Sequence, residues 1–438
     1  MQIQPVPNDG SQGQIKPLCN YLFSLQNNPL PSIATMQINQ KINQIRASGT
    51  AVIAQRTKEL IAHGQDIIDL SEGQPYYNTP HDVIQAAADA AFAGHTTYTP
   101  IPGIPELRDA IASKINSQSN TCYSTDNIVV GCGGKQLVYN AMMVSLEPFD
   151  EVIIPAPYWV SYPEIVKLAG GIPIIIKCSV ANDFKLTPKQ LEEAITPNTR
   201  WLVINSPANP TGSVYSYQDL QQFAEILRNH SHVCILSDDI YEAIVFDHHK
   251  FWNLTTVAPD LSSRVLTISG VSKSYAMTGW RIGYCAGEID FITAMIRLQG
   301  QSTTSPPTPS QYAALKAITG PQNILQKWQT EYQKSRDLFI TLLRDNIGLD
   351  IHSPSGAFYL FIGCSRYIGH NSYNGKCIKT DHDFCNFLLE EALVSCIPGS
   401  EFGSEGYFRL CFSKPQSTLR KAAKRINDAL SGLSNDAP

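Results

Sequence analysis

One stretch of the sequence combines an amine and a guanidinium at the end of an apolar run. It reads S-G-V-S-K-S-Y-A-M-T-G-W-R-I-G-Y over residues 269–284 and contains Lys273 and Arg281. An amine forms a Schiff base only when it can lose its proton near neutral pH, which burial and positive neighbours promote. Arginine binds phosphate through two parallel hydrogen bonds. A lone lysine and arginine would be surface residues at a strand end, but the whole string favours Schiff-base chemistry beside a bound phosphate.

Further motifs of this kind are spread along the chain. Two of them, N-S-P-A-N-P-T-G (205–212) and S-D-D-I-Y-E (237–242), combine with S-K-x-x-A-M-T-G-W-R-I-G to resemble class I aminotransferases of the pyridoxal-phosphate (PLP) fold-type I superfamily. The closest resemblance is to the bacterial aspartate/prephenate aminotransferase subgroup, and it runs from about residue 47 to residue 430. The motifs that also agree with it are Y-T-P-x-x-G-I-P-E-L-R (98–108), G-G-K-Q (133–136), P-Y-W-V-S-Y-P (157–163), Q-S-T-T-S-P (301–306) and P-S-G-A-F-Y (354–359).

The resemblance implies pyridoxal 5′-phosphate as cofactor and Lys273 as the residue that carries it. The pyridine nitrogen must be protonated to accept electrons, so a carboxylate is expected to face it. Asp238 takes this role by resemblance. Its neighbour Asp239 stands where the family often has Glu, and we interpret Asp239 as structural. Asn209 and Tyr241 match the family positions that donate hydrogen bonds to the phenolic oxygen of the ring.

The phosphate of such a cofactor needs backbone N–H groups at the start of a helix. Gly133 and Gly134 follow an apolar run and open a helical pattern, and glycine lets the backbone approach a ligand closely. Arg281 would supply the positive charge. Ser272 or Ser269 could supply a hydroxyl, and the sequence does not choose between them.

Two aromatic residues complete the cofactor site that the resemblance implies. Trp159 is expected to stack on the ring. A single tryptophan in an α/β protein usually belongs to the core, but the motif around Trp159 favours a cofactor contact. Tyr98 corresponds to a tyrosine that in the family reaches the phosphate of the neighbouring subunit. The resemblance therefore implies a homodimer with shared active sites.

The α-carboxylate of an amino-acid substrate can be gripped by a buried arginine. Arg409, in Y-F-R-L-C-F, lies at the family position for this role, and the neutral alternative is an exposed strand arginine. Gly73, in S-E-G-Q-P, matches the glycine whose backbone meets the substrate. Glu72 and Gln74 stand where relatives often have Ala and Glu or Asp, so the local polarity differs. The implied substrate contacts also include Trp159 and Asn209.

An acidic substrate needs a second positive group for its distal carboxylate. In the resembled subgroup a lysine and a threonine do this, and they correspond here to Lys135 and Thr50. Arg46 stands where that subgroup has a basic residue linked to the use of prephenate. The alternative for Lys135 is that it pairs with the cofactor phosphate.

The resemblance therefore implies transamination of aspartate or glutamate with 2-oxoglutarate or oxaloacetate, with prephenate as a further substrate. The implied mechanism is a ping-pong double displacement in which Lys273 is the general base. The alternative functions are a PLP lyase and a broad or aromatic aminotransferase on the same fold. A nucleic-acid-binding regulator is disfavoured, because the formal net charge is −5.

The elements that must position these residues alternate between strands and helices. Buried strands are expected at 128–131, 152–155, 172–177, 201–205, 233–237 and 265–269. Helices are expected at 135–145, 161–169, 188–194 and 217–228. This alternation is typical of an α/β fold with a mostly parallel, doubly wound sheet, whose ligands bind at the carboxyl ends of the strands. The fold that the resemblance implies is the PLP fold-type I aminotransferase fold.

The pattern changes after Gly320. A long amphipathic helix is expected at 324–343, a hairpin-like apolar run at 357–362 and a terminal helix at 417–430, which together suggest a smaller α+β domain. Residues 363–381 are rich in Gly, Asn, Ser and Tyr and favour a loop insertion. The expected divisions are a flexible leader at 1–35, a segment at 36–79 packing on the small domain, a PLP-binding domain at 80–318 and a small domain at 319–438.

The composition is that of an ordinary globular protein. The 11 cysteines are scattered singly, without a C-x-x-C pair, which favours reduced thiols in a cytoplasmic protein and gives no metal site. No apolar run approaches the length of a membrane span. The leader at 1–35 has no arginine and no continuous apolar core, so it is a poor targeting peptide, and Met36 is an alternative start.

Overall fold

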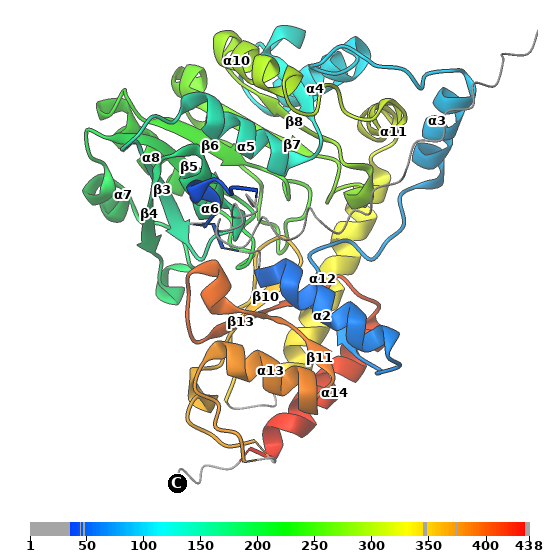
Figure 1. Cartoon of the computed structure of the whole chain (residues 1–438), viewed down its shortest axis with the longest axis vertical. Coiled ribbons are helices and arrows are strands. Elements are labelled where there is room, and N and C mark those ends of the chain that lie inside the picture. The colour runs from blue at the N-terminus through cyan, green and yellow to red at the C-terminus, as the bar shows by residue number, and fades with distance from the viewer. Residues whose placement is uncertain (1–35, 44, 47–48, 345–347, 373–374, 434–438) are drawn as a thin grey trace, which may run out of the picture.

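The computed structural model describes residues 36–43, 45–46, 49–344, 348–372 and 375–433. The expected leader at 1–35 lies outside the described residues. Two sheets organise the fold, a large one in the upper part of Figure 1 and a small one in the lower part.

The large sheet has seven strands in the order β2-β8-β7-β6-β5-β3-β4. Neighbouring strands are parallel, except that β8 runs antiparallel to both β2 and β7. The strands are β2 (Ile128–Gly131), β3 (Glu151–Ala156), β4 (Ile172–Lys177), β5 (Thr199–Asn205), β6 (Cys234–Asp238), β7 (Val265–Gly270) and β8 (Gly283–Ala286). The α/β fold with a mostly parallel sheet is confirmed.

All six expected strands form, but β4 is not buried as expected. It lies at the edge of the sheet, and all of its residues are exposed or half-buried, with Ile172 42% exposed. Its apolar run Ile172–Ile176 suggested a central strand, yet only β3 pairs with it among the described strands. The strand β8 was not expected, because its first two residues, Gly283 and Tyr284, are also the last two of the Lys273 motif.

Helices cover both faces of this sheet (Figure 1). In α8 the buried residues Leu220, Phe223, Ala224 and Leu227 follow the spacing of one helical face. Its N-terminus is capped by the Ser216 hydroxyl, which accepts from the backbone N–H of Asp219 at 3.1 Å. The helices of this part are α3 (His81–Phe92), α4 (Pro105–Gln118), α5 (Gly134–Ser145), α6 (Ser161–Ala169), α7 (Pro188–Ala194), α8 (Tyr217–Asn229), α9 (Leu254–Val257), α10 (Ile289–Gly300) and α11 (Thr308–Thr319).

The small sheet is antiparallel, in the order β12-β13-β10-β9. Its central pair, β10 and β13, is fully buried apart from Tyr407. The strands are β9 (Asp350–Ile351), β10 (Tyr359–Gly363), β12 (Ile397–Pro398) and β13 (Tyr407–Cys411), and the helices around them are α12 (Asn323–Arg344), α13 (Asp381–Glu391) and α14 (Gln416–Ser431). The long helix α12 connects the two parts of the molecule in Figure 1.

The N-terminal segment contacts both parts. The short helix α1 (Gln40–Asn43) lies against α6, whereas α2 (Gly49–Ala62) lies against the small sheet. The buried Thr57 of α2 shares a hydrogen bond of 2.7 Å with Ser395 of β11 (Val394–Ser395). β1 (Ile68–Asp69) pairs in parallel with β11. The segment from α1 to β1 is therefore held next to the junction of the two sheets.

That junction is packed rather than open. Tyr241, Ile244 and Phe246, which follow β6, belong to the same core cluster as α12, β10 and β13. Such a shared apolar core fixes the carboxyl edge of the large sheet against the small sheet. Among the described helices, none has the length and apolar character needed to cross a membrane.

Candidate active site

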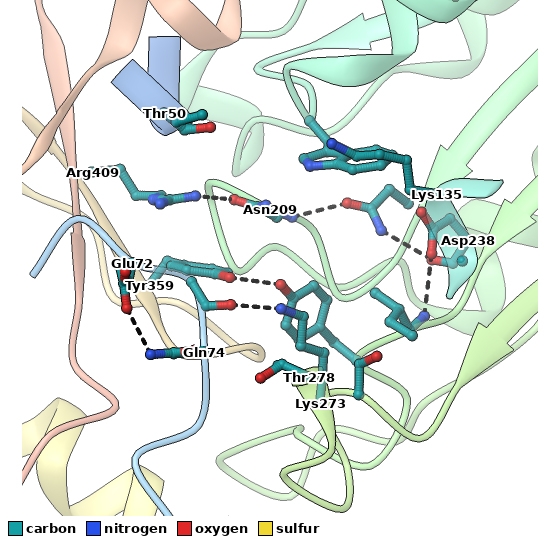
Figure 2. Close-up of a pocket in the computed structure, with 18 of the residues that line it drawn as sticks. Thr50, Glu72, Gln74, Lys135, Asn209, Asp238, Lys273, Thr278, Tyr359 and Arg409 are labelled. Atoms are coloured by element: carbon teal, nitrogen blue, oxygen red, sulfur yellow. Dashed lines mark hydrogen bonds between the residues drawn. The ribbon is translucent and has the colours of Figure 1, made fainter. Parts of the chain in front are cut away.

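A cavity of about 400 Å³ lies where the carboxyl ends of the large sheet meet the small sheet. Figure 2 shows its side chains converging from both sheets and from α2. It is lined by Thr50, Ala51, Ala54, Ser71, Glu72, Gly73, Gln74, Gly134, Lys135, Trp159, Tyr162, Asn205, Asn209, Asp238, Ile240, Tyr241, Ser272, Lys273, Thr278, Arg281, Tyr359 and Arg409. The fold therefore brings together most of the residues expected from the sequence.

Lys273 follows β7 and points into this cavity (Figure 2). Its Nζ donates a hydrogen bond to the carbonyl oxygen of Gly73 at 2.5 Å. Burial lowers the pKa of Lys273 to about 8, and the charges of Arg409 and Arg281 also lower it, while Cys411 and Asp238 act in the opposite direction. The fraction of neutral amine near pH 7 is therefore far larger than for an ordinary lysine.

Asp238 is the last residue of β6 and is buried. Its Oδ2 accepts a hydrogen bond from the Tyr162 hydroxyl at 2.5 Å, and its Oδ1 accepts from the backbone N–H of Ile240 at 3.3 Å. Burial raises the pKa of this carboxyl, while the two hydrogen bonds and the charge of Lys273 lower it. A positively charged group bound beside Asp238 would therefore favour the ionised carboxylate.

Asp239 turns away from the cavity. Its carboxylate accepts hydrogen bonds from Ser237 at 2.7 Å and from Asn253 at 3.0 Å. Burial raises the pKa of Asp239 to about 7. These contacts connect β6 to the start of α9 and agree with a structural role.

The start of α5 forms one end of the cavity. Gly133 has a φ of 90°, a backbone conformation that residues with a side chain rarely adopt, and an added Cβ would collide with the guanidinium of Arg281. Glycine at this position therefore lets Arg281 lie against the backbone at the start of α5. Nη1 of Arg281 donates to the carbonyl oxygen of Thr278 at 2.8 Å, and Nη2 donates to that of Cys132 at 3.2 Å. A guanidinium and the N-terminus of a twelve-residue helix therefore face the same end of the cavity.

The structure distinguishes the two serines that the sequence left open. Ser272 lines the cavity beside Lys273. Ser269 faces a different cavity and donates to the carbonyl oxygen of Asp239 at 3.5 Å. Ser272 is therefore the serine placed to contact a ligand here.

Aromatic side chains form the walls. Trp159 lies edge-to-face with Tyr162, with ring centroids 5.1 Å apart, and Nζ of Lys135 is 5.1 Å from the Trp159 ring. Burial lowers the pKa of Lys135, and the charge of Arg281 lowers it further. The hydroxyls of Tyr241 and Tyr359 share a hydrogen bond of 2.6 Å.

Arg409 is buried, which excludes the exposed-strand alternative. Its Nη1 donates to Oδ1 of Asn209 at 2.9 Å and its Nη2 donates to the carbonyl oxygen of Ser71 at 2.5 Å. The guanidinium lies over the rings of Tyr359 and Phe402, at 4.5 and 5.0 Å. Among the described residues Nε of Arg409 has no hydrogen-bond partner, so the group keeps capacity for an anionic ligand.

Two expected residues lie elsewhere. Tyr98 is 91% exposed and does not line the cavity of this chain. Arg46 lines a neighbouring cavity, which shares Lys135 and Arg281 with the first one. Among the described residues no group of His, Cys, Asp and Glu is arranged to hold a metal ion.

Among the polar residues of this site that were not singled out from the sequence are Tyr162, Asn205 and Tyr359. Asn205 ends β5 and lies opposite Asp238, the last residue of β6, so the ends of these neighbouring strands were a usable signal. Tyr162 is the second residue of α6 and belongs to the same motif, P-Y-W-V-S-Y-P, as Trp159, whose ring lies 5.1 Å from its own. Tyr359 ends the motif P-S-G-A-F-Y, but its partner Tyr241 was visible only in the fold.

Comparison with known proteins gives a consistent result. The family model described as "Aminotransferase class I and II" matches residues 65–426. A protein of Rickettsia felis named "Probable aspartate/prephenate aminotransferase" is 45% identical over 397 residues, which are 91% of this chain and 97% of that protein.

Solved structures are similar over the same extent. The crystal structure of the aspartate aminotransferase from Rhizobium meliloti has a TM-score of 0.88 and 44% identity, covering 91% of this chain and 100% of that one. The aspartate aminotransferase of Thermus thermophilus with maleate has a TM-score of 0.84 and 35% identity, covering 90% and 100%.

Proposed function

This chain belongs to the class I and II aminotransferases, and from that premise we propose that it transfers the amino group of aspartate or glutamate to a 2-oxo acid. The amino acceptors would be 2-oxoglutarate and oxaloacetate, with prephenate as a further substrate. The Rickettsia felis relative named for aspartate and prephenate supports this choice.

One observation carries the proposal. Lys273, Asp238 and Arg409 come from three separate elements and line one cavity. They supply an amine with a pKa of about 8, a buried carboxylate and a buried guanidinium. An amino acid needs an anchor for its α-carboxylate and a base near its α-carbon, and this set provides both.

The family uses PLP, and the residues of the cavity fit this cofactor. The amine of Lys273 would hold it covalently, Asp238 would face its ring nitrogen and Trp159 its ring. Asn209 and Tyr241 would face the phenolic oxygen. The phosphate would lie at the start of α5, and the residues proposed to hold it are Gly133, Gly134, Ser272 and Arg281.

When bound, PLP supplies an aldehyde that condenses with amines and a ring that takes up the electron pair left by the α-proton. Arg409 holds the α-carboxylate through its guanidinium, supported by Asn209. The backbone of Gly73, which lines the cavity, would face the bound substrate. Once the amine of the substrate has replaced it on the cofactor, the free Nζ of Lys273 would take the proton from the α-carbon, because its lowered pKa makes neutral amine available.

Thr50 and Lys135 would bind the distal carboxylate of an acidic substrate. Both line the cavity, Thr50 from α2 and Lys135 from α5. One solved relative was determined with maleate, a dicarboxylate, which supports a cavity of this kind. Lysine is a point charge on a flexible stem, so it can bind this group without a rigid geometry.

We further propose a homodimer in the cytoplasm. Tyr98 is 91% exposed, as is the nearby Phe92, and exposed apolar side chains of this size favour an interface. A second copy would bring its Tyr98 to the phosphate end of the site. The ten described cysteines are all free, which suits a reducing compartment.

A half-transamination screen tests the activity. The PLP-loaded protein is mixed with one amino acid at a time, and the absorbance change of the cofactor is followed. Aspartate and glutamate are expected to give a rapid change and to release their 2-oxo acids. Release of ammonia without amine transfer would instead indicate a lyase, and no change with any amino acid would refute the proposal.

A further inference from the structure

One charged side chain of the cavity has no part in the proposed reaction, and it is Glu72. The others bind the proposed cofactor or substrate. The charged side chains that line the cavity among the described residues are Glu72, Lys135, Asp238, Lys273, Arg281 and Arg409. A carboxylate on the wall of a site for acidic amino acids would repel its own substrate unless it is compensated.

Glu72 has a compensating partner on α2. Its Oε1 lies 2.7 Å from Nζ of Lys58, and its Oε2 accepts a hydrogen bond from Nε2 of Gln74 at 2.6 Å. The Glu72 side chain is 19% exposed, whereas that of Lys58 is 63% exposed. The hydrogen bond that Lys58 donates to Glu72 raises the pKa of Lys58, so the lysine stays charged across the neutral range.

The backbone around Glu72 is held on both sides. The carbonyl oxygen of Ser71 accepts from Nη2 of Arg409, and that of Gly73 accepts from Nζ of Lys273, each at 2.5 Å. Glu72 therefore belongs to the loop that contacts both central cations of the site. Its side chain lies on the wall of the cavity in Figure 2, bonded to Gln74.

Lys58 lies on the helix face that borders the cavity. Thr50, Ala54 and Lys58 are spaced by four residues, which places them along one face of α2. Thr50 and Ala54 line the cavity, and Lys58 continues the same row towards solvent. The ion pair therefore joins the wall that carries Thr50 to the loop that carries Gly73.

We propose that Glu72 and Lys58 form a charge-compensated pair that determines how well this site accepts an amino acid with an acidic side chain. Glu72 is the specificity-determining residue, and Lys58 acts through it. The inference rests on the proposed function. The Glu72 side chain is only 19% exposed, so water and salt screen its charge from a bound substrate only in part.

The two single variants are expected to change kcat/KM for an acidic substrate in opposite directions. Lys58→Met leaves Glu72 uncompensated and is expected to lower kcat/KM for aspartate roughly 5- to 20-fold. Glu72→Gln keeps the shape and leaves the lysine charge, so kcat/KM for aspartate is expected to rise about two- to fivefold. Alanine has no distal carboxylate, and its kcat/KM is expected to change less than about twofold in both variants.

The double variant distinguishes this role from a purely structural one, in which the ion pair only holds α2 in position. In the Glu72→Gln background, Lys58→Met is expected to have almost no effect on the ratio of aspartate to alanine efficiency. Loss of a purely structural pair would lower both efficiencies together. The matched control is Lys421→Met on α14. Nζ of Lys421 lies 2.7 Å from Asp66, away from the cavity, and its removal is expected to leave both efficiencies unchanged.

A binding measurement provides a second readout without turnover. The affinity of the loaded enzyme for succinate and for butyrate is measured from the cofactor absorbance, and Lys58→Met is expected to weaken succinate selectively. Equal weakening of both acids, or an unchanged aspartate to alanine ratio, would overturn the inference while leaving the proposed function in place. A wild-type protein that transaminates no amino acid would overturn both.

Discussion

The hydroxyl of Tyr162 donates a hydrogen bond of 2.5 Å to Oδ2 of Asp238, and both residues are buried. Tyr162 is the second residue of α6, whereas Asp238 ends β6, so the contact exists only in the folded chain. Burial raises the pKa of Asp238, and this hydrogen bond lowers it. The hydroxyl of Tyr162 therefore favours the charged form of Asp238 more than the charge of Lys273 does, and the proposed cofactor ring requires this charged form.

Replacing Tyr162 by phenylalanine tests this relationship. Without the hydroxyl, the pKa of Asp238 rises further, so the carboxylate is lost at a higher pH on acidification. The acid limb of the kcat/KM profile is expected to move to higher pH, and kcat to fall at least about tenfold at neutral pH, since hydrogen bonds to charged groups contribute about 1.5–3 kcal/mol.

Tyr123→Phe is the matched control for Tyr162→Phe, because it removes a buried hydroxyl that has no hydrogen-bond partner among the described residues. Its pH profile is expected to match that of the wild type. An acid limb that stays in place in Tyr162→Phe would show that Tyr162 does not control the charge of Asp238.

Asp238→Asn tests the carboxylate itself. The variant is expected to bind PLP, since the other proposed contacts remain, but to lose most of its activity because the ring nitrogen is no longer held protonated. Activity is measured with aspartate and 2-oxoglutarate under saturating PLP. A variant within about tenfold of the wild type, or about 1.4 kcal/mol of activation free energy, would contradict the role of Asp238.

The lowered pKa of Lys273 predicts how the apoprotein captures its cofactor. The neutral amine reacts with the aldehyde, and half of the amine is neutral at the pKa of about 8. The rate of PLP binding is therefore expected to reach half of its maximum near pH 8 instead of near pH 10.5, the ordinary value. Stopped-flow absorbance checks this.

Borohydride reduction identifies the lysine that binds PLP. Mass spectrometry of peptides is expected to find the reduced cofactor on Lys273, and Lys273→Ala is expected to abolish turnover. Label on Lys135, the other lysine of the cavity, would show that the assignment is wrong.

Local patterns predicted much of this fold. The strands from β2 to β7 and the helices α6 and α7 follow from apolar runs and helical spacing within a few residues of the chain. The edge position of β4 and the antiparallel strand β8 could not be predicted in this way, because the order of strands depends on long-range pairing. The expected domain boundaries stay predictions.

The place of Lys273 and Arg409 in the cavity was predictable, because each lies in a motif that can be recognised in the sequence. The site was not predictable where a contact joins distant elements. Tyr162 with Asp238 and Glu72 with Lys58 are pairs whose members lie 76 and 14 residues apart, and only the folded chain brings them together. Ser272 and Ser269, three residues apart, became distinguishable only in the fold, where they line different cavities.

The exposed Tyr98 predicts a shared site between two copies. Sedimentation equilibrium is expected to give twice the mass of the chain under assay conditions. Tyr98→Phe is expected to weaken PLP affinity, because the proposed hydrogen bond to the phosphate would be lost, with little change in mass. Fully active monomers would contradict the dimer, and unchanged PLP affinity in Tyr98→Phe would contradict the role of Tyr98.

Lys135 provides the test of substrate choice. Its side chain lines the cavity near Trp159, and burial with the charge of Arg281 lowers its pKa, so binding of an anion beside it is favoured. Charge-assisted hydrogen bonds contribute roughly 1.5–3 kcal/mol, or about 10- to 150-fold in catalytic efficiency. Lys135→Ala is expected to lower kcat/KM for aspartate by about that factor, while affecting alanine and phenylalanine much less.

The pattern across substrates decides what Lys135 does. A distal carboxylate occurs only in acidic substrates, whereas the cofactor phosphate is present with all of them. A selective loss with aspartate and glutamate therefore assigns Lys135 to the substrate. An equal loss with alanine, together with weaker PLP affinity, would assign it to the phosphate and remove the main support for acidic substrates. Lys189→Ala, which removes an exposed lysine near Glu193 on α7, is the control and is expected to leave every substrate unchanged.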